Sequence, residues 1–356
     1  MANEAPLSFE ANAFQSFVRG LRDVWRTEAY RGSVEAARAA GSDDPAEIER
    51  RVRDVPAYKL YSWLERHSQQ LKYYGRWGIV RWMEERKDAL AAVLAAAARQ
   101  HPERLVLDAS LQIPGYVTEV DTHQHRGGLW SDPCDAFAFE TSAGGYSFSL
   151  FNSREPMVVY ADTARALVPE AKEIIDMGCT IGGSTRALKR AFPAAKVTGI
   201  ELCAPPLMLA HLRALEQGLE VHWRQANAER LPFDAASADL VASHWLYHEM
   251  PPAAVRNSVR DARRVLRKGG GFMAYDMYLL SGGGVGRWLH AGYAARNNEP
   301  FALAYASMDM KSELEAAGFG EIEMHIAHPA PTKEVAAGDL PPVRTHYITM
   351  ITARAV

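Results

Sequence analysis

Cysteine is scarce in this sequence, with three among 356 residues. Cys134, Cys179 and Cys203 are odd in number and have no paired spacing. That pattern argues against a disulfide framework and favours a reducing compartment. We therefore expect a cytoplasmic location.

An excess of either charge is also absent, because 40 Lys and Arg residues nearly balance 43 Asp and Glu residues and leave a net charge of −3. Nucleic acid and anionic membranes are therefore not expected as partners. Long apolar runs are missing too, since the strongest one, Ala89–Ala98, is too short to cross a bilayer. Residues 1–10 lack the basic-then-apolar order of a signal peptide, so we expect none.

What is present is enough chain for two domains, since single cores seldom grow past about 250 residues. Residues 9–100 have helical patterning, with aromatic residues crowded between Pro56 and Met83. The aromatic cluster fits a helix–helix core with a dimer contact, or an aromatic wall around a substrate. We predict a mostly helical domain over 1–150, serving as lid, substrate wall or dimer surface, and an α/β domain over 151–356.

The stretch Glu173–Thr185 is the organising element of the second domain. Its two isoleucines are typical of a short buried strand, and its three glycines then allow a sharp turn. Residues 183–192 continue with a helical pattern. The free N–H groups at the start of that helix are expected to point at a ligand.

The glycine turn suits either of two ligand classes. A dinucleotide site requires G-x-G-x-x-G, but the middle position here is Thr180. Asp176 would also repel a pyrophosphate, whereas it would attract the ammonium and sulfonium groups of S-adenosylmethionine. The residues thus favour a cationic ligand over an anionic one.

Asp176–Gly183 resembles the first motif of the class I S-adenosylmethionine-dependent methyltransferases, usually written D-x-G-x-G-x-G. Further segments are similar to later motifs of that family in the same order, namely Lys196–Leu202, Arg224–Phe233, Ala238–His244 and Val265–Asp276. The resemblance is to small-molecule enzymes of the ubiquinone and menaquinone biosynthesis type. It implies a Rossmann-like α/β fold, with a mostly parallel sheet and an antiparallel last strand, and S-adenosylmethionine as cofactor. Thr180 departs from the motif, and its β-carbon costs energy if the position needs a positive φ.

The resemblance also implies where the cofactor binds. In this family the acid after the second strand, here Glu201, binds the ribose hydroxyls, and Asn227 stands where an acid meets the adenine amino group. Ligands of parallel sheets lie beyond the carboxyl ends of the strands, where Ser243 also falls. The predicted cofactor-binding residues are Tyr160, Asp176, Gly178, Cys179, Thr180, Gly182, Glu201, Leu202, Asn227, Ala228, Glu229, Ser243 and His244.

The fourth strand runs into the polar segment His244–Pro251, which we expect to face the transferred methyl group. We predict His248, Glu249 and Tyr247 as catalytic residues. A neutral histidine near pH 7 suits removal of a proton from the acceptor, and Glu249 would orient an imidazole. A hydrogen-bonded structural histidine is the competing interpretation. Methyl transfer depends mainly on alignment, so a base is optional.

The N-terminal domain contributes a second group of polar residues. Residues 116–125 alternate like an extended segment, which would place Glu119, Asp121, His123 and His125 on one face. A metal site and a hydrogen-bonded network both remain open for that face, but methyl transfer from a sulfonium needs no metal, and we predict none. The predicted substrate-binding residues are His123, His125 and Tyr278.

Two glycine-rich segments are expected to help close the cleft. Residues 127–146 are predicted to form a loop-rich connector, and residues 281–286 a hinge before an insertion over 287–301 that would roof the acceptor pocket. We predict transfer of a methyl group to an O, N, S or C atom of a small-molecule acceptor, with a homodimer as the possible assembly. The alternatives are an NAD(P)-dependent oxidoreductase and a non-catalytic S-adenosylmethionine-binding regulator.

Overall fold

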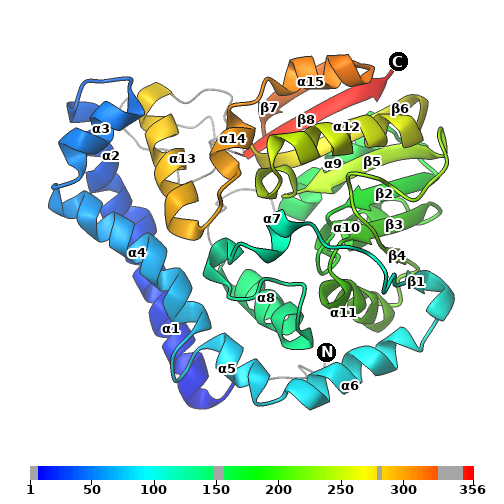
Figure 1. Ribbon diagram of the computed structural model, residues 1–356, viewed down its shortest axis with the longest axis horizontal. Coiled ribbons are helices and arrows are strands. Elements are labelled where there is room, and N and C mark those ends of the chain that lie inside the picture. The colour runs from blue at the N-terminus through cyan, green and yellow to red at the C-terminus, as the bar shows by residue number, and fades with distance from the viewer. Residues whose placement is uncertain (1–6, 147–155, 279–282, 328–347) are drawn as a thin grey trace.

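The computed structural model describes residues 7–146, 156–278, 283–327 and 348–356. Within these residues one eight-stranded sheet is covered by helices, and further helices surround one side of it (Figure 1). The strands are β1 (Leu105–Val106), β2 (Glu173–Met177), β3 (Lys196–Glu201), β4 (His222–Gln225), β5 (Ala238–His244), β6 (Leu266–Met277), β7 (Phe319–Ile326) and β8 (Ile348–Ala355).

The strand order is β1-β4-β3-β2-β5-β6-β8-β7. Within the described residues only the two pairs that include β8 are antiparallel, and the other five are parallel. The predicted α/β fold, with a mostly parallel sheet and an antiparallel strand near its end, is confirmed. The winding of the chain reverses between β2 and β5, and ligands of such sheets bind at this switch point, beyond the carboxyl ends of the strands.

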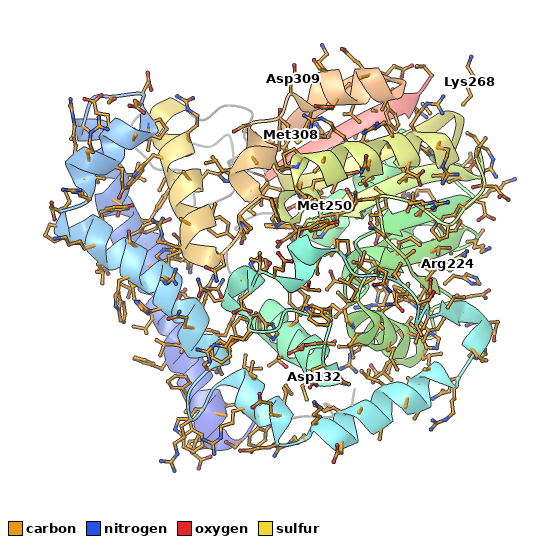
Figure 2. All side chains as sticks on the ribbon, in the orientation of Figure 1. Asp132, Arg224, Met250, Lys268, Met308 and Asp309 are labelled. Atoms are coloured by element: carbon orange, nitrogen blue, oxygen red, sulfur yellow. The ribbon has the colours of Figure 1, made fainter. Side chains whose placement is uncertain are left out.

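The helices of the second half are α9 (Pro156–Leu167), α10 (Gly183–Ala191), α11 (Ala204–Glu216), α12 (Pro252–Val265), α13 (Gly283–Asn297), α14 (Ala302–Ala306) and α15 (Met310–Ala317). Helices α9 to α12 and α15 cover both faces of the sheet because its strands are apolar on both sides, whereas α13 packs against α3 and α4. Ile174 packs with α9 and α10 on one face, whereas Ile175 packs with α12 and α15 on the other. Met250 and Met308, labelled in Figure 2, belong to the same buried cluster as Ile175.

The helices of the first half are α1 (Phe9–Val24), α2 (Tyr30–Ala39), α3 (Pro45–Val52), α4 (Pro56–Tyr73), α5 (Ile79–Glu84), α6 (Lys87–Ala98), α7 (Gly115–Thr118) and α8 (Pro133–Tyr146). Helices α1 to α4 lie on the α13 side of the molecule, and α6 and α8 lie against α11 (Figure 1). Tyr58, Tyr61 and Tyr73 are buried, so part of the predicted aromatic cluster belongs to the core, whereas Trp63 is 51% exposed. No helix of the described residues is long and apolar enough to span a bilayer.

The prediction of an extended segment over residues 116–125 is wrong. Helix α7 and a 3-10 turn over Thr122–Gln124 occupy it. His123 and Gln124 adopt left-handed backbone conformations with φ of 55° and 62°. Two successive left-handed residues reverse the chain, so the alternating side chains do not share one face.

The loop-rich connector predicted over 127–146 is also wrong in its second part, because α8 begins at Pro133. Asp132 starts this helix by accepting the Cys134 N–H at 2.9 Å. The predicted hinge is helical from Gly283 onwards, and its first two residues lie outside the described residues. The predicted domain boundary at residue 150 lies outside them as well. The division stays a prediction, and β1 of the first half pairs with β4 of the second.

Candidate active site

A left-handed turn joins β2 to α10 at the carboxyl edge of the sheet. Gly178, Thr180 and Gly182 have φ of 64°, 48° and 71°. A β-carbon on Gly182 would lie 2.3 Å from Trp223, and one on Gly178 would lie 2.6 Å from Leu246. Both glycines are therefore required by backbone conformation and by packing. Thr180 holds the left-handed conformation despite its branched side chain, which is the costly case anticipated from the sequence.

Asp176 lies beneath this turn with no exposed surface. Its Oδ1 accepts the Tyr160 hydroxyl at 2.9 Å, and its Oδ2 accepts the hydroxyls of Ser184 and Thr185 at 2.7 and 2.6 Å. Burial raises the pKa of Asp176, while the three hydroxyl donors act in the opposite direction. The carboxylate thus ties α9 and α10 to the end of β2 and places a buried acidic group under the turn.

Glu201 ends β3 beside the same turn. Its Oε2 accepts the Thr180 N–H at 2.9 Å, and its Oε1 accepts the N–H groups of Leu202 and Cys203 at 2.7 and 3.0 Å. Burial raises the pKa of Glu201, against the lowering effect of these three backbone donors. The carboxylate is therefore fixed in place while its side chain stays partly accessible.

The residues predicted to meet the adenine follow β4. The side chain of Asn227 accepts the Glu229 N–H at 2.8 Å and donates to Glu229 Oε1 at 3.3 Å. Tyr116 from α7 donates its hydroxyl to the same oxygen at 3.0 Å. Ala228 between them is buried. The N-terminal half therefore contacts the predicted adenine side of the site directly.

Aromatic contacts connect the glycine turn to the segment that follows β5. The ring of His244 stacks on Tyr275 at 4.7 Å and meets Tyr160 edge-on at 5.2 Å. Trp245, the next residue, contacts the His248 ring edge-on at 5.8 Å between centroids. Ser243, which precedes this segment, is fully buried at the end of β5. The predicted cofactor residues and the predicted catalytic histidine thus share one continuous packed region.

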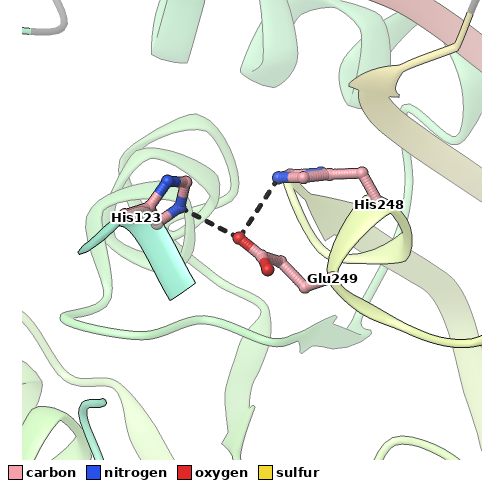
Figure 3. A group of neighbouring side chains, drawn as sticks. All are labelled: His123, His248 and Glu249. Carbon is pink, nitrogen blue, oxygen red and sulfur yellow. Dashed lines mark ion pairs between the residues drawn. The ribbon is translucent and has the colours of Figure 1, made fainter. Parts of the chain in front are cut away.

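Five charged residues form what we call the His–Glu cluster. His123 Nε2 and His248 Nε2 lie 2.9 and 3.4 Å from Glu249 Oε1 (Figure 3). The second nitrogen of each ring meets a further carboxylate, with Glu299 Oε1 3.0 Å from His123 Nδ1 and Asp276 Oδ1 2.5 Å from His248 Nδ1. The side chains of His123 and Glu249 are 32% and 27% exposed, so a small ligand has access to the cluster.

The carboxylates change the ionisation of both histidines. Desolvation lowers the pKa of His123, but Glu249 and Glu299 outweigh it and raise the pKa to about 9. In the same way, Asp276 and Glu249 outweigh the effect of burial and raise the pKa of His248 well above its usual value. Burial acts to raise the pKa of Glu249, yet the two imidazoles lower it overall. The upward shift in the pKa of His248 acts against the role of a general base near pH 7, which stays a prediction.

Other residues predicted for catalysis or substrate binding lie elsewhere. The Tyr247 side chain is fully buried and packs against Tyr305, so this residue contacts the cluster through its backbone N–H, which Asp276 accepts at 2.6 Å. The Tyr278 hydroxyl donates to the Met308 carbonyl oxygen at 2.6 Å and fixes the segment before α15. His125 is buried 3.1 Å from Asp135. Of the three predicted substrate residues, the structure places His123 alone in the His–Glu cluster.

Several residues of the site escaped the sequence analysis. Asp276 is the penultimate residue of β6, so the same strand-end rule that selected Ser243 applies to it. Ser184 and Thr185 follow the glycine turn directly and hold Asp176. Glu299 lies in the insertion over 287–301 that was expected to roof the acceptor pocket, but no local signal singled it out, because its place depends on how α13 packs.

The residues at this edge fit S-adenosylmethionine. Glu201 retains acceptor capacity beyond its three backbone donors, and a carboxylate with free acceptor positions suits a vicinal diol. The buried carboxyl group of Asp176 beneath the turn disfavours a pyrophosphate and favours a cation. The antiparallel β8 within the order β6-β8-β7 also differs from the all-parallel order of dinucleotide-binding folds, which counts against the oxidoreductase alternative.

Comparisons with known proteins agree with this geometry. A family model described as a methyltransferase domain matches residues 174–270. Over 101 residues the chain is 41% identical to a ubiquinone biosynthesis O-methyltransferase of Nitrosococcus oceani, covering 28% of this chain and 41% of that protein. It is 28% identical over 163 residues to an uncharacterized methyltransferase of Synechocystis, covering 45% of this chain and 72% of that protein. The chain thus spans about two fifths of the length of the ubiquinone-type relative.

Solved structures are similar at lower identity. One is a phosphoethanolamine N-methyltransferase 2 of Haemonchus contortus, with a TM-score of 0.48, 15% identity, and coverage of 68% of this chain and 60% of that one. Another is the [4+2]-cyclase SpnF, with a TM-score of 0.41, 22% identity, and coverage of 55% and 78%. The strand order and the glycine turn with Glu201 agree with the family model, so residues 174–270 of this chain match a methyltransferase domain.

Proposed function

We propose that the protein transfers a methyl group from S-adenosylmethionine to a small-molecule acceptor. The observation that supports this most is a convergence at the switch point between β2 and β5. The glycine turn with Glu201 lies on one side of it, and the His–Glu cluster follows β5 on the other. A donor and an acceptor bound at these two places are neighbours.

The cofactor half of the site is the part formed by the glycine turn, Glu201 and Asn227. Glu201 would hold the ribose hydroxyls, and Asn227 would face the adenine, both kept in position by backbone N–H groups. Asp176 supports the turn from below through three hydroxyl groups. When bound, S-adenosylmethionine supplies a methyl group on a sulfonium, which departs as a neutral thioether.

The acceptor half is the His–Glu cluster. His123 and Glu249 keep exposed surface, whereas Asp276 and Glu299 are buried behind them and fix their partners. The cluster is therefore rigid and polar, and it suits an acceptor with hydroxyl groups, which both donate and accept hydrogen bonds. Relatives named as O-methyltransferases favour an oxygen atom as the methylated position. Holding that oxygen in line with the methyl group supplies much of the rate acceleration.

The proposal is tested first by calorimetric titration of the full chain with S-adenosylmethionine and, separately, with a reduced nicotinamide dinucleotide. We expect binding of the former and none of the latter. Metabolite extracts incubated with methyl-labelled cofactor then reveal the acceptor by mass spectrometry. Binding without any labelled product in any extract would favour a regulator, and binding of the dinucleotide instead would refute the proposal.

A cytoplasmic location and a homodimer belong to the same proposal. The described chain has three cysteines, all free and buried, which suits a reducing compartment. Phe17 of α1 and Trp63 of α4 are 58% and 51% exposed, and such side chains are common in subunit interfaces. Light scattering of the wild type and of the variant Phe17→Glu with Trp63→Glu tests the dimer. We expect a dimer that becomes a monomer, and a monomeric wild type would refute it.

A further inference from the structure

The two imidazoles of the His–Glu cluster use their nitrogen atoms in the same way. Both imidazoles use Nδ1 toward a buried carboxylate, Asp276 for His248 and Glu299 for His123. Both therefore direct Nε2 at the same oxygen, Oε1 of Glu249, as Figure 3 shows. The three ligand atoms all lie within 4.8 Å of one another. A buried carboxylate that fixes Nδ1–H is the usual support for a histidine that binds metal through Nε2.

The supporting carboxylates are themselves held in place. Asp276 accepts the backbone N–H groups of Tyr247 and Met277 at 2.6 and 2.7 Å in addition to His248. Glu299 has no exposed surface and accepts the Tyr293 hydroxyl at 2.5 Å. Its Oε2 is buried and has no hydrogen-bond partner among the described residues. A buried carboxylate oxygen in that state is costly to the fold, and such a cost is commonly retained where a residue serves a functional site.

We propose that His123, His248 and Glu249 bind a divalent transition-metal cation, with Glu299 and Asp276 as the groups that orient the two imidazoles. The observed separations of 2.9 and 3.4 Å between each Nε2 and Glu249 Oε1 suit this role. Two ligand atoms bound to one cation at about 2.1 Å, at tetrahedral or octahedral angles, lie about 3.0 to 3.4 Å apart. The two-histidine, one-carboxylate set is used for Zn²⁺ and Fe²⁺, and it leaves coordination positions open.

The backbone around the cluster is strained, as expected where a site is held in a demanding geometry. Eight non-glycine residues of the described chain have positive φ, and four of them are His123, Gln124, Trp245 and Asn298, which belong to or adjoin the cluster. Each such residue costs on the order of 1 kcal/mol or more. Gln124 compensates part of this cost by donating to the Arg296 carbonyl oxygen at 2.8 Å, which fixes the turn that presents His123.

The open positions of the cation define the class of acceptor. This step rests on the proposed function, whereas binding of the cation does not. An acceptor hydroxyl bound to the cation loses its proton to solvent more readily, because the metal stabilises the oxyanion. The oxygen lone pair then forms the new bond to the methyl carbon, while the carbon–sulfur bond breaks and its electron pair stays on sulfur. The acceptor is thus a compound with an accessible hydroxyl, or two adjacent oxygens that chelate the cation.

The experiment uses the full chain after removal of metals by a chelator. Calorimetric titration with Zn²⁺, and separately with Mn²⁺ and Mg²⁺, is expected to show one site for the transition metals and much weaker binding of Mg²⁺. His123→Ala and Glu249→Gln should each weaken Zn²⁺ binding at least 100-fold. Glu299→Gln, which alters a supporting group only, should weaken it on the order of 10- to 100-fold. His101→Ala removes an exposed histidine outside the cluster and is the matched control, with no change expected.

Thermal unfolding checks that each variant is folded, and the visible absorption of bound Co²⁺ is read in parallel as a direct report of low coordination number. Zn²⁺ binding that is absent in the wild type, or equal in the wild type and His123→Ala, would overturn the inference. Titration with S-adenosylmethionine distinguishes failure of the metal-site inference from failure of the proposed function. If the chain binds the cofactor but no metal, only the inferred metal site is refuted. If it binds the metal but no cofactor, only the proposed methyltransferase function is refuted.

Discussion

The two halves of the site differ in how the chain builds them. The cofactor half comes largely from one continuous stretch, in which β2, the glycine turn, α10 and β3 follow one another and Glu201 bonds back to the Thr180 N–H. The His–Glu cluster instead brings together side chains from a turn of the N-terminal half, the segments after β5 and α13, and the end of β6. The cofactor half of the site therefore depends on short-range geometry, whereas the His–Glu cluster depends on long-range packing.

The comparison predicts that damage to the glycine turn destabilises the whole domain. Gly182→Ala should lower the free energy of unfolding by about 2–4 kcal/mol, because the β-carbon meets Trp223 at 2.3 Å and φ is positive. Gly218→Ala is the matched control, since its φ is also positive but nothing lies within 4 Å of the added carbon. Chemical denaturation measures both. Equal losses in the two variants would show that the packing contact has no effect.

Substitutions in the His–Glu cluster should lower the turnover number without changing the affinity for the cofactor. Glu249→Gln is expected to lower kcat on the order of 100-fold, because the position of the acceptor is lost, while the dissociation constant of S-adenosylmethionine stays within about twofold. Steady-state kinetics and calorimetry measure the two quantities. A matching loss of cofactor affinity would contradict the separation of the site into two halves.

For Glu201, the acid at the end of β3, we expect the reverse: a loss of cofactor affinity without an effect on the His–Glu cluster. Glu201→Ala should weaken S-adenosylmethionine binding by on the order of 10-fold or more, since hydrogen bonds to a charged group contribute about 1.5–3 kcal/mol. Glu220→Ala alters an exposed acid just before β4 and serves as the control. Binding of Zn²⁺ should be the same in both variants. Unchanged cofactor affinity in Glu201→Ala would mean that the ribose lies elsewhere.

The smallest effect concerns the residue that departs from the family pattern. Thr180→Gly removes a branched side chain from a left-handed position with φ of 48°. We expect a gain of about 0.5–1 kcal/mol in the free energy of unfolding, reduced by the greater freedom of glycine in the unfolded chain. Thermal melts with and without cofactor measure it. A loss of stability would show that the Thr180 side chain makes a contribution that outweighs its strain.

Much of the fold was accessible from the sequence because its signals are local. The strands around Ile174 and Val197, and the helix that starts at Gly183, lie within one or two residues of their predicted places. The segment over residues 116–125 was misjudged for an equally physical reason. Its alternating side chains indicated a strand, but two left-handed residues, His123 and Gln124, reverse the backbone there. Tertiary contacts such as the bond from Gln124 to the Arg296 carbonyl oxygen hold that reversal.

The sequence by itself determined the strand–turn–helix unit, the need for glycine at 178 and 182, and the acid at 201 that meets the turn. These follow from backbone sterics and from the spacing of neighbouring elements. Only the tertiary structure decided that His123 faces Glu249, and that Glu299 and Asp276 lie behind the two imidazoles. The same packing decided the direction in which the pKa values of the two histidines shift, because a pKa depends on burial and on charges that are distant in the chain.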